Sequence, residues 1–137
     1  MEYIRGLCWV LRYYYQGVPS WTWYFPHHYA PCFSDLVGLK DVEQARKFEL
    51  GEPFPPLEQL VAVLPPLSAK ALPPPLRTIF DSNDPKLAQF FPKKVSYDLN
   101  GAREVYKAVV LLPFIDAAVL KAACAPLVAT LDAESKA

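Results

Sequence analysis

The chain is poor in the features that mark several common classes of protein. Its 14 basic and 14 acidic residues cancel, so no net charge draws the whole molecule to nucleic acid, and any such contact must be local. Its three cysteines, Cys8, Cys32 and Cys124, are widely spaced and lack the paired Cys or His spacings of a zinc site or a disulfide framework. The five glycines are isolated, which excludes a phosphate-binding glycine loop.

Long apolar runs are also missing. No stretch approaches the roughly 18 to 20 apolar residues that a membrane-spanning helix needs. The first residues are aromatic and charged where a signal peptide would have an apolar core. Together with the unpaired cysteines, this predicts a soluble, intracellular protein without a membrane partner.

Proline and large apolar side chains are abundant instead. Hydrophobic residues make up 53% of the chain and aromatic residues 14%, far more than a solvated tail carries. The chain has 15 prolines, and those between residues 51 and 76 allow only short helices joined by extended links. Such a stretch could alternatively be a polyproline ligand for another domain. Leucines and valines interleaved with the prolines favour burial: Leu57, Leu60, Val61, Val63, Leu64 and Leu67.

The first predicted element is a helix over residues 3–15. Its apolar side chains recur every three or four residues, and Gly17 and Pro19 end it. Trp9 and Tyr13 make the opposite side apolar too, so the helix is expected to be largely enclosed, with Trp9, Tyr13 and Leu11 buried or packed. Alone, it would expose a surface that needs a cover.

The remaining elements are predicted to be short. The final helix is expected to start at the cap Asp116 and to be kinked or divided at Pro126. The segment 109–112 fits either a buried strand or the end of a helix from Arg103. Between the first and last helices, the pattern predicts an irregular aromatic loop over 18–34, a short helix in 40–47, a helix from Pro56 that stops before Pro65, a short helix using Leu76, Ile79 and Phe80, and turns at 81–85 and 98–101. The fold class is therefore mainly α, with short helices joined by long ordered loops rich in proline and aromatic residues.

One motif is more specific than these patterns. A Trp-containing helix ends in Tyr-Tyr-Tyr-x-Gly and leads into Ser-Trp-x-Trp, an aromatic pair and Pro-x-His-Tyr-Ala-Pro. This segment, Trp9 to Asp35, closely resembles the second conserved region of Xrn/Rat-type 5′-to-3′ exoribonucleases. The likeness continues at residues 48–51, 53–54, 56–60, 63–65, 71–73, 91–92, 98–101 and 109–116.

The resemblance implies that residues 1–137 are a partial domain of a larger nuclease fold, with a poor match after about residue 120. Family members are implied to degrade RNA from a 5′-monophosphate end, with Mg or Mn held by acidic residues of their first conserved region. This chain would shape the single-stranded RNA channel and pack against that N-terminal catalytic region. It would hold no metal and have no nuclease activity alone. The alternative is a stand-alone module from a truncated gene that binds RNA or protein without catalysis.

The resemblance also implies a role for a tryptophan of the motif, which would stack on bases beside the active site. Trp21 and Trp23 are the two candidates, and the motif does not separate them. Stacking on a flat ring tolerates any base. The structural alternative is that both indoles belong to the core. Further candidates for the channel loop are Tyr24, His28 and Tyr29.

No catalytic residue or metal ligand can be named from the sequence. Two-metal hydrolysis needs several converging carboxylates, and the acidic residues here are scattered. Asp81 and Asp84 are the only notable close pair, and the Asn and Pro beside them indicate a turn. The adjacent His27 and His28 are expected to serve in packing, because neighbours usually point apart and no third ligand has suitable spacing.

Overall fold

The computed structural model describes residues 1–131. The chain divides into two compact units, Met1–Phe54 and Pro55–Ala137. Helices dominate both, as the sequence predicted, and a single two-stranded sheet occurs in the described residues.

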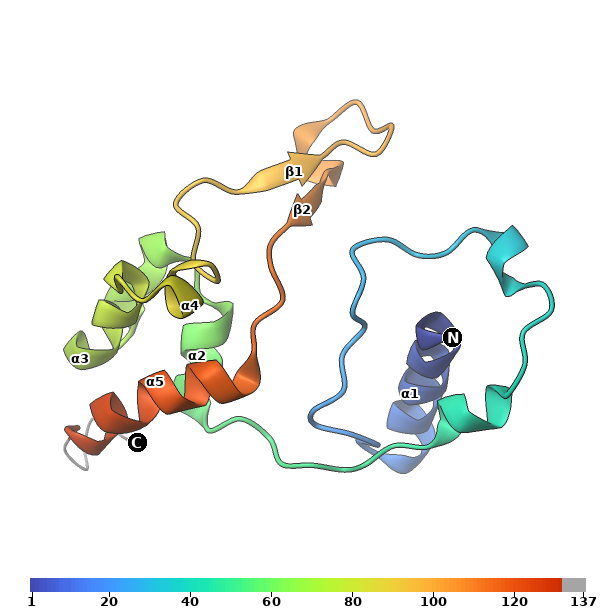
Figure 1. Cartoon of the computed structure of the whole chain (residues 1–137), viewed down its shortest axis with the longest axis horizontal. Coiled ribbons are helices and arrows are strands. Elements are labelled where there is room, and N and C mark those ends of the chain that lie inside the picture. The colour runs from blue at the N-terminus through green and yellow to red at the C-terminus, as the bar shows by residue number, and fades with distance from the viewer. Residues whose placement is uncertain (132–137) are drawn as a thin grey trace. The chain divides into compact units, whose positions relative to one another are not determined.

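The first unit is built around α1, Glu2–Gln16, which ends at Gly17 with φ of 91°. The bounds of this helix and its end at Gly17 agree with the prediction. The 3₁₀ helix Val42–Arg46 packs beside α1 (Figure 1), and a second, Phe33–Leu36, follows the aromatic loop. Arg5 and Arg12 of α1 tie the packed segment down by donating to the backbone oxygens of Lys47 and Arg46, at 3.0 and 3.2 Å.

The described residues do not enclose α1, in line with the expectation that the helix alone exposes a surface, but the expected packing of Leu11 is wrong. None of the helix residues is buried, and Leu11 is 61% exposed. Trp9 and Tyr13 are packed, because their rings stack at 5.3 Å and 8°. The physical reason is that residues 18–54 provide partners for one side of the helix only. This leaves an apolar surface uncovered, formed by Leu7, Val10 and Tyr14, with Leu11 and Tyr15 exposed beside it.

Prolines start most helices of the second unit rather than merely ending them. α2 (Pro56–Val63), α3 (Pro74–Arg77) and α4 (Pro85–Ala88) all begin with proline, as does the 3₁₀ helix Pro66–Ala71. The first helical position suits proline, since its missing amide would have no partner there and its φ is already helical. α4 was not predicted; it begins at Pro85, where the predicted turn over 81–85 ends, and the 3₁₀ helix Thr78–Asp81 precedes that turn.

The core of the second unit forms where α5, Ala117–Ala129, contacts α2, α3 and α4 (Figure 1). Leu120 and Cys124 of α5 are fully buried, as are Val61 and Leu76 from the helices it contacts. Asp116 caps α5 as predicted, with its Oδ1 accepting from the amides of Ala118 and Val119 at 2.8 and 3.2 Å. Of the two outcomes predicted at Pro126, a kink or a division, the division does not occur: the helix continues to Ala129, and Pro126 lies in its last turn.

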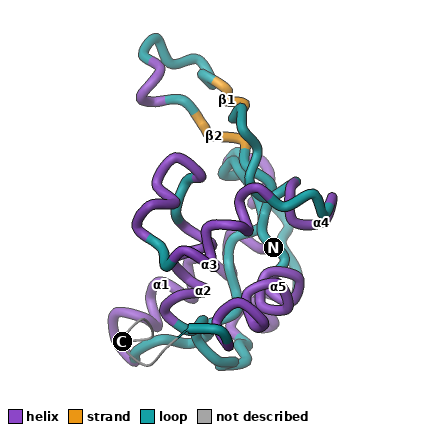
Figure 2. The backbone as a smooth tube through the Cα atoms, turned by 90° about the vertical axis from the view of Figure 1, so that its left-hand side faces the viewer, coloured by secondary structure: helices purple, strands orange, loops and turns teal. Residues whose placement is uncertain are grey.

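The open choice at residues 109–112 is resolved as a strand. β2, Val109–Leu111, pairs antiparallel with β1, Ser96–Asp98, and Tyr97 lies opposite Val110. The predicted turn follows β1, with positive φ at Asn100 and Gly101, and the 3₁₀ helix Val105–Lys107 precedes β2. Figure 2 shows this hairpin extending away from the helices of its own unit.

Candidate functional site

Ser20 is the anchor of the aromatic loop that carries the sequence motif. Its side chain is almost fully buried, at 3% exposure. Its backbone oxygen accepts from the indole nitrogen of Trp9 at 3.0 Å. Its Oγ accepts from the amides of Thr22 and Trp23, at 3.4 and 3.2 Å, and so closes a bend at residues 21 and 22. Because of this bend, the two motif tryptophans do not follow the simple alternation of an extended chain.

Trp23 turns toward α1. Its indole Nε1 donates to Glu2 Oε2 at 3.1 Å, and its ring meets Phe48 edge to face at 5.9 Å. The tip of the indole would lie 3.2 Å from a Cβ atom added at Gly6, so α1 is close to this ring. Trp23 therefore packs the loop onto the helix.

Trp21 has the opposite environment. Its side chain is 47% exposed, while its backbone amide donates to the oxygen of Leu50 at 2.7 Å. Within residues 1–131, the indole has neither a ring contact nor a hydrogen bond. An aromatic face on a backbone held by hydrogen bonds is what a stacking platform requires.

The other predicted loop residues lie on the same segment. Tyr24 and Tyr29 are 53% and 41% exposed, and His28 is exposed as well. His27 packs its ring against Phe25 at 5.3 Å, in agreement with the expected packing role.

Gly51 lets the next segment approach this loop. Its φ is 63°, and an added Cβ would lie 2.6 Å from Thr22 Cγ2 and 3.0 Å from its Oγ1. Gly38 has a similar φ of 69° but no atom within 4 Å of an added Cβ. A side chain at either glycine would strain the backbone, but only at Gly51 would it also collide with Thr22. Comparing the two positions therefore separates backbone strain from collision.

We expect Gly38→Ala to cost about 1 to 2 kcal/mol of unfolding free energy, from left-handed strain alone. Gly51→Ala should cost a further 1 to 3 kcal/mol, roughly, because a well-packed site must shift. Urea unfolding of both variants measures the difference. In a Thr22→Ala background the extra cost at Gly51 should largely vanish; an undiminished difference there would contradict the collision.

The acidic residues in the described part of the chain do not gather into a metal site. No group of three or more His, Cys, Asp or Glu side chains that could hold a metal ion occurs in residues 1–131. Asp84 caps α4, with its Oδ1 accepting from the amide of Lys86 at 2.9 Å, which agrees with the turn expected near Asp81. Asp35 accepts from the amide of Cys32 at 2.9 Å. These carboxylates have local backbone partners, so the residues present do not fit a bound Mg or Mn ion.

The thiol of Cys124 offers no nucleophile either. Cys124 is fully buried in α5, and burial together with the nearby charge of Glu58 raises the pKa of its thiol to about 11. A thiol in that state stays protonated at neutral pH, and the thiolate is the reactive form. Cys124 is a core residue.

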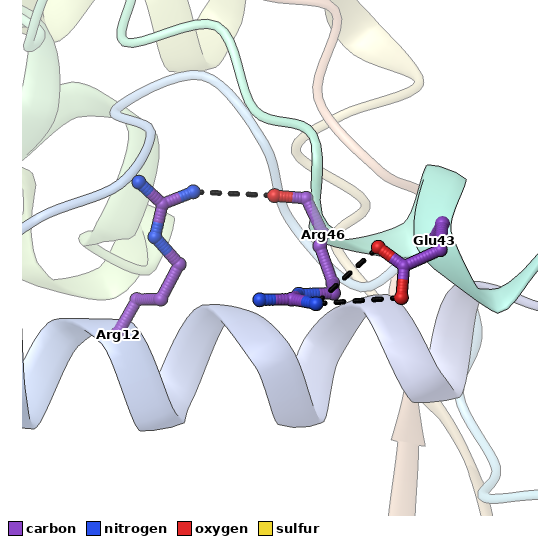
Figure 3. A network of polar contacts seen from close by, with 3 residues as sticks. All are labelled: Arg12, Glu43 and Arg46. Carbon is purple, nitrogen blue, oxygen red and sulfur yellow. Dashed lines mark hydrogen bonds and ion pairs between the residues drawn. The ribbon is translucent and has the colours of Figure 1, made fainter.

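A basic groove along α1 was not predicted from the sequence. Figure 3 shows Arg12 directed at the backbone oxygen of Arg46, whose side chain meets Glu43. Arg12 and Arg46 are 34 residues apart, and the chain has no net charge, so neither spacing nor composition signals the cluster.

No helix in the described part of the chain is long and apolar enough to cross a membrane.

Comparisons with known proteins give a consistent result. Residues 1–137 match the family described as "Xrn1 helical domain". The 5′-3′ exoribonuclease 2 of Eremothecium gossypii is 49% identical over 122 residues, covering 89% of this chain and 13% of that protein. The 5′-3′ exoribonuclease 2 of Gallus gallus is 47% identical over 123 residues, with the same two coverages of 89% and 13%. The 5′-3′ exoribonuclease 1 of Saccharomyces cerevisiae is 44% identical over 135 residues, covering 98% of this chain and 9% of that protein. The chain thus spans about a tenth of the length of these relatives.

Proposed function

Since the chain belongs to the Xrn1 helical domain family, we propose that it is the helical part of a 5′-3′ exoribonuclease and shapes the path of single-stranded RNA. The observation that carries the proposal is the exposed indole of Trp21, whose backbone amide is held by a hydrogen bond to Leu50. It occurs in a chain 49% identical to a 5′-3′ exoribonuclease.

Trp21 would act as the stacking platform. Stacking of a base on an aromatic ring is worth roughly 1 to 3 kcal/mol and does not depend on base identity, which suits an enzyme that moves along any RNA. Trp23 would support the platform from behind, through Glu2 and Phe48. Tyr24, His28 and Tyr29 would extend the channel wall on the same loop.

The chemistry would come from outside the described residues. Mg or Mn ions would activate water and stabilise the leaving oxygen, held by carboxylates of an N-terminal catalytic region. The uncovered apolar side of α1 supports such a partner, because exposed patches of this kind mark interaction surfaces. An intracellular location, cytoplasmic or nuclear, is part of the same proposal.

The test compares two RNAs of one sequence, with a 5′ monophosphate and a 5′ hydroxyl, in the complete protein that carries this chain. Mononucleotides should leave the 5′ end of the monophosphate RNA at least about tenfold faster, because hydrogen bonds to a charged group contribute about 1.5 to 3 kcal/mol. An internal label and a 3′ label identify the end that is attacked. Equal rates, or release from the 3′ end, would contradict the proposal.

A further inference from the structure

A groove with a volume of about 690 Å³ lies between α1 and the 3₁₀ helix Val42–Arg46. Its size falls in the range of sites for small ligands, roughly 300 to 1,000 Å³. Arg12, Arg46 and Lys47 line it together with the ring of Tyr15, and Glu43 is the single carboxylate in the lining.

Arg12 is held in place without losing its charge. Its Nε donates to Gln16 Oε1 at 3.2 Å and its Nη1 to the backbone oxygen of Arg46 at 3.2 Å, and both acceptors are neutral. The guanidinium also lies 5.9 Å from the ring centre of Phe48. A guanidinium has five N–H donors, so the bonds to Gln16 and Arg46 leave donors for an anion.

The one carboxylate in the groove does not neutralise it. Glu43 meets Arg46 Nη1 at 3.3 Å, with side chains 80% and 65% exposed (Figure 3). Exposed pairs of this kind contribute little, so an incoming anion can compete for Arg46. Lys47 adds a further positive charge on the same wall.

The charges of the first unit are unevenly distributed. Lys40 lies outside this area, whereas Arg5 donates to the backbone oxygen of Lys47 and lies over Phe48 at 5.1 Å, beside the groove. All other basic residues of the unit line the groove itself, while its acidic residues are spread along the sequence: Glu2, Asp35, Asp41, Glu43, Glu49 and Glu52. The groove is therefore a local positive region in a unit with more acidic than basic residues.

The ring of Tyr15 favours single-stranded nucleic acid over an acidic peptide as the ligand. Its side chain is 82% exposed and lies on the wall of the same groove. Cations beside an open aromatic ring are typical of sites that bind single-stranded nucleic acid, whereas an acidic peptide would not need the ring. We propose that this groove binds the phosphate backbone of single-stranded RNA, with Arg12, Arg46 and Lys47 each neutralising a neighbouring phosphate and Tyr15 stacking on an adjoining base. The assignment rests on the proposed function and adds a second RNA contact to that of Trp21.

The test measures binding of a labelled single-stranded RNA with EDTA present, over a series of salt concentrations, in the complete protein that carries this chain. Each cation that contacts a phosphate contributes about 0.7 to the magnitude of the slope of log K against log salt, where K is the binding constant. Removing one such cation should lower that magnitude by about 0.7. Arg46→Gln should remove about 0.7 and the pair Arg12→Gln with Arg46→Gln about 1.4, with roughly tenfold weaker binding for each. Lys40→Gln is the matched control and should leave the slope unchanged.

Two further arms identify the ligand. Tyr15→Leu should weaken binding with the parental slope, since it removes a ring and no charge. Uridine monophosphate should compete with RNA better than uridine does, and this advantage should shrink in the double variant Arg12→Gln with Arg46→Gln; an undiminished advantage there would overturn phosphate recognition in the groove. A parental slope in both Arg46→Gln and the double variant would overturn the proposal, whatever the Tm of these variants.

The same experiment separates this inference from the stacking role of Trp21. Trp21→Ala should lower affinity without changing the slope. If Trp21→Ala has no effect while the Arg variants lose slope, the role proposed for Trp21 fails and the groove stands. If Trp21→Ala weakens binding and the Arg variants keep the parental slope, the groove is wrong and the stacking role stands.

Discussion

Replacing Trp21 with alanine is expected to slow the degradation of single-stranded RNA about tenfold in the complete protein that carries this chain, with little change in Tm. One lost stacking contact is worth roughly 1 to 3 kcal/mol, and about 1.4 kcal/mol corresponds to a factor of ten in rate. The fold should survive, because the indole is 47% exposed and the backbone bond from Trp21 to Leu50 does not involve the side chain.

Trp23→Ala is the matched comparison. The motif alone predicts the same tenfold loss of turnover for both tryptophans, without unfolding, but their surroundings differ. Trp23 would lose its hydrogen bond to Glu2 and its contact with Phe48, so we expect a loss of about 2 to 3 kcal/mol in unfolding free energy. Parallel measurements of Tm and turnover separate the two variants. Parental turnover in Trp21→Ala would show that the exposed indole does not contact RNA.

The pair illustrates where sequence patterns stop being informative. Ser-Trp-x-Trp identified the loop and its family, yet the direction of each indole depends on the hydrogen bonds of the buried Ser20 hydroxyl and on Glu2, which is 21 residues before Trp23. Spacing along the chain does not contain that information. The groove was missed for the same reason, since Arg12 meets Arg46 only through the packing of α1 on the 3₁₀ helix.

Local signals predicted the helices well. α1 follows from apolar spacing and ends at a glycine with positive φ, and Asp116 caps α5 through the bonds expected of it. β1 was missed because its three residues, Ser96–Asp98, are all exposed and carry no alternating burial pattern. α4 was missed because Asp84 and Pro85, which end the predicted turn over 81–85, occur in turns and at helix starts alike.

The uncovered side of α1 connects the fold to the proposed function. Val10 and Tyr14 of α1 are 48% and 77% exposed, and removing apolar surface from water is worth roughly 25 cal/mol for each Å². The described residues do not bury this apolar surface of α1, so they do not gain that free energy. A catalytic region packed on α1 would gain it, and the helix would then hold the aromatic loop against the region that performs the chemistry.

The 137-residue chain by itself is expected to release no mononucleotides from RNA with a 5′ monophosphate, whichever divalent ion is supplied. Two-metal hydrolysis requires carboxylates that converge on ions about 3.5 to 4 Å apart. In residues 1–131 no three potential ligands come together, and the carboxylates of Asp35, Asp84 and Asp116 accept from nearby backbone amides.

The assay incubates purified chain with 5′-labelled RNA and magnesium or manganese, beside a sample with a chelator. A 5′-3′ exoribonuclease on the same RNA serves as the positive control, and binding in the chelator sample shows that the chain is folded and engages its substrate. Release of labelled mononucleotide that requires the metal would contradict the prediction and would mean that these residues assemble an active site of their own. Binding without release would instead separate the two tasks, with substrate contact in this chain and bond cleavage dependent on carboxylates that it does not bring together.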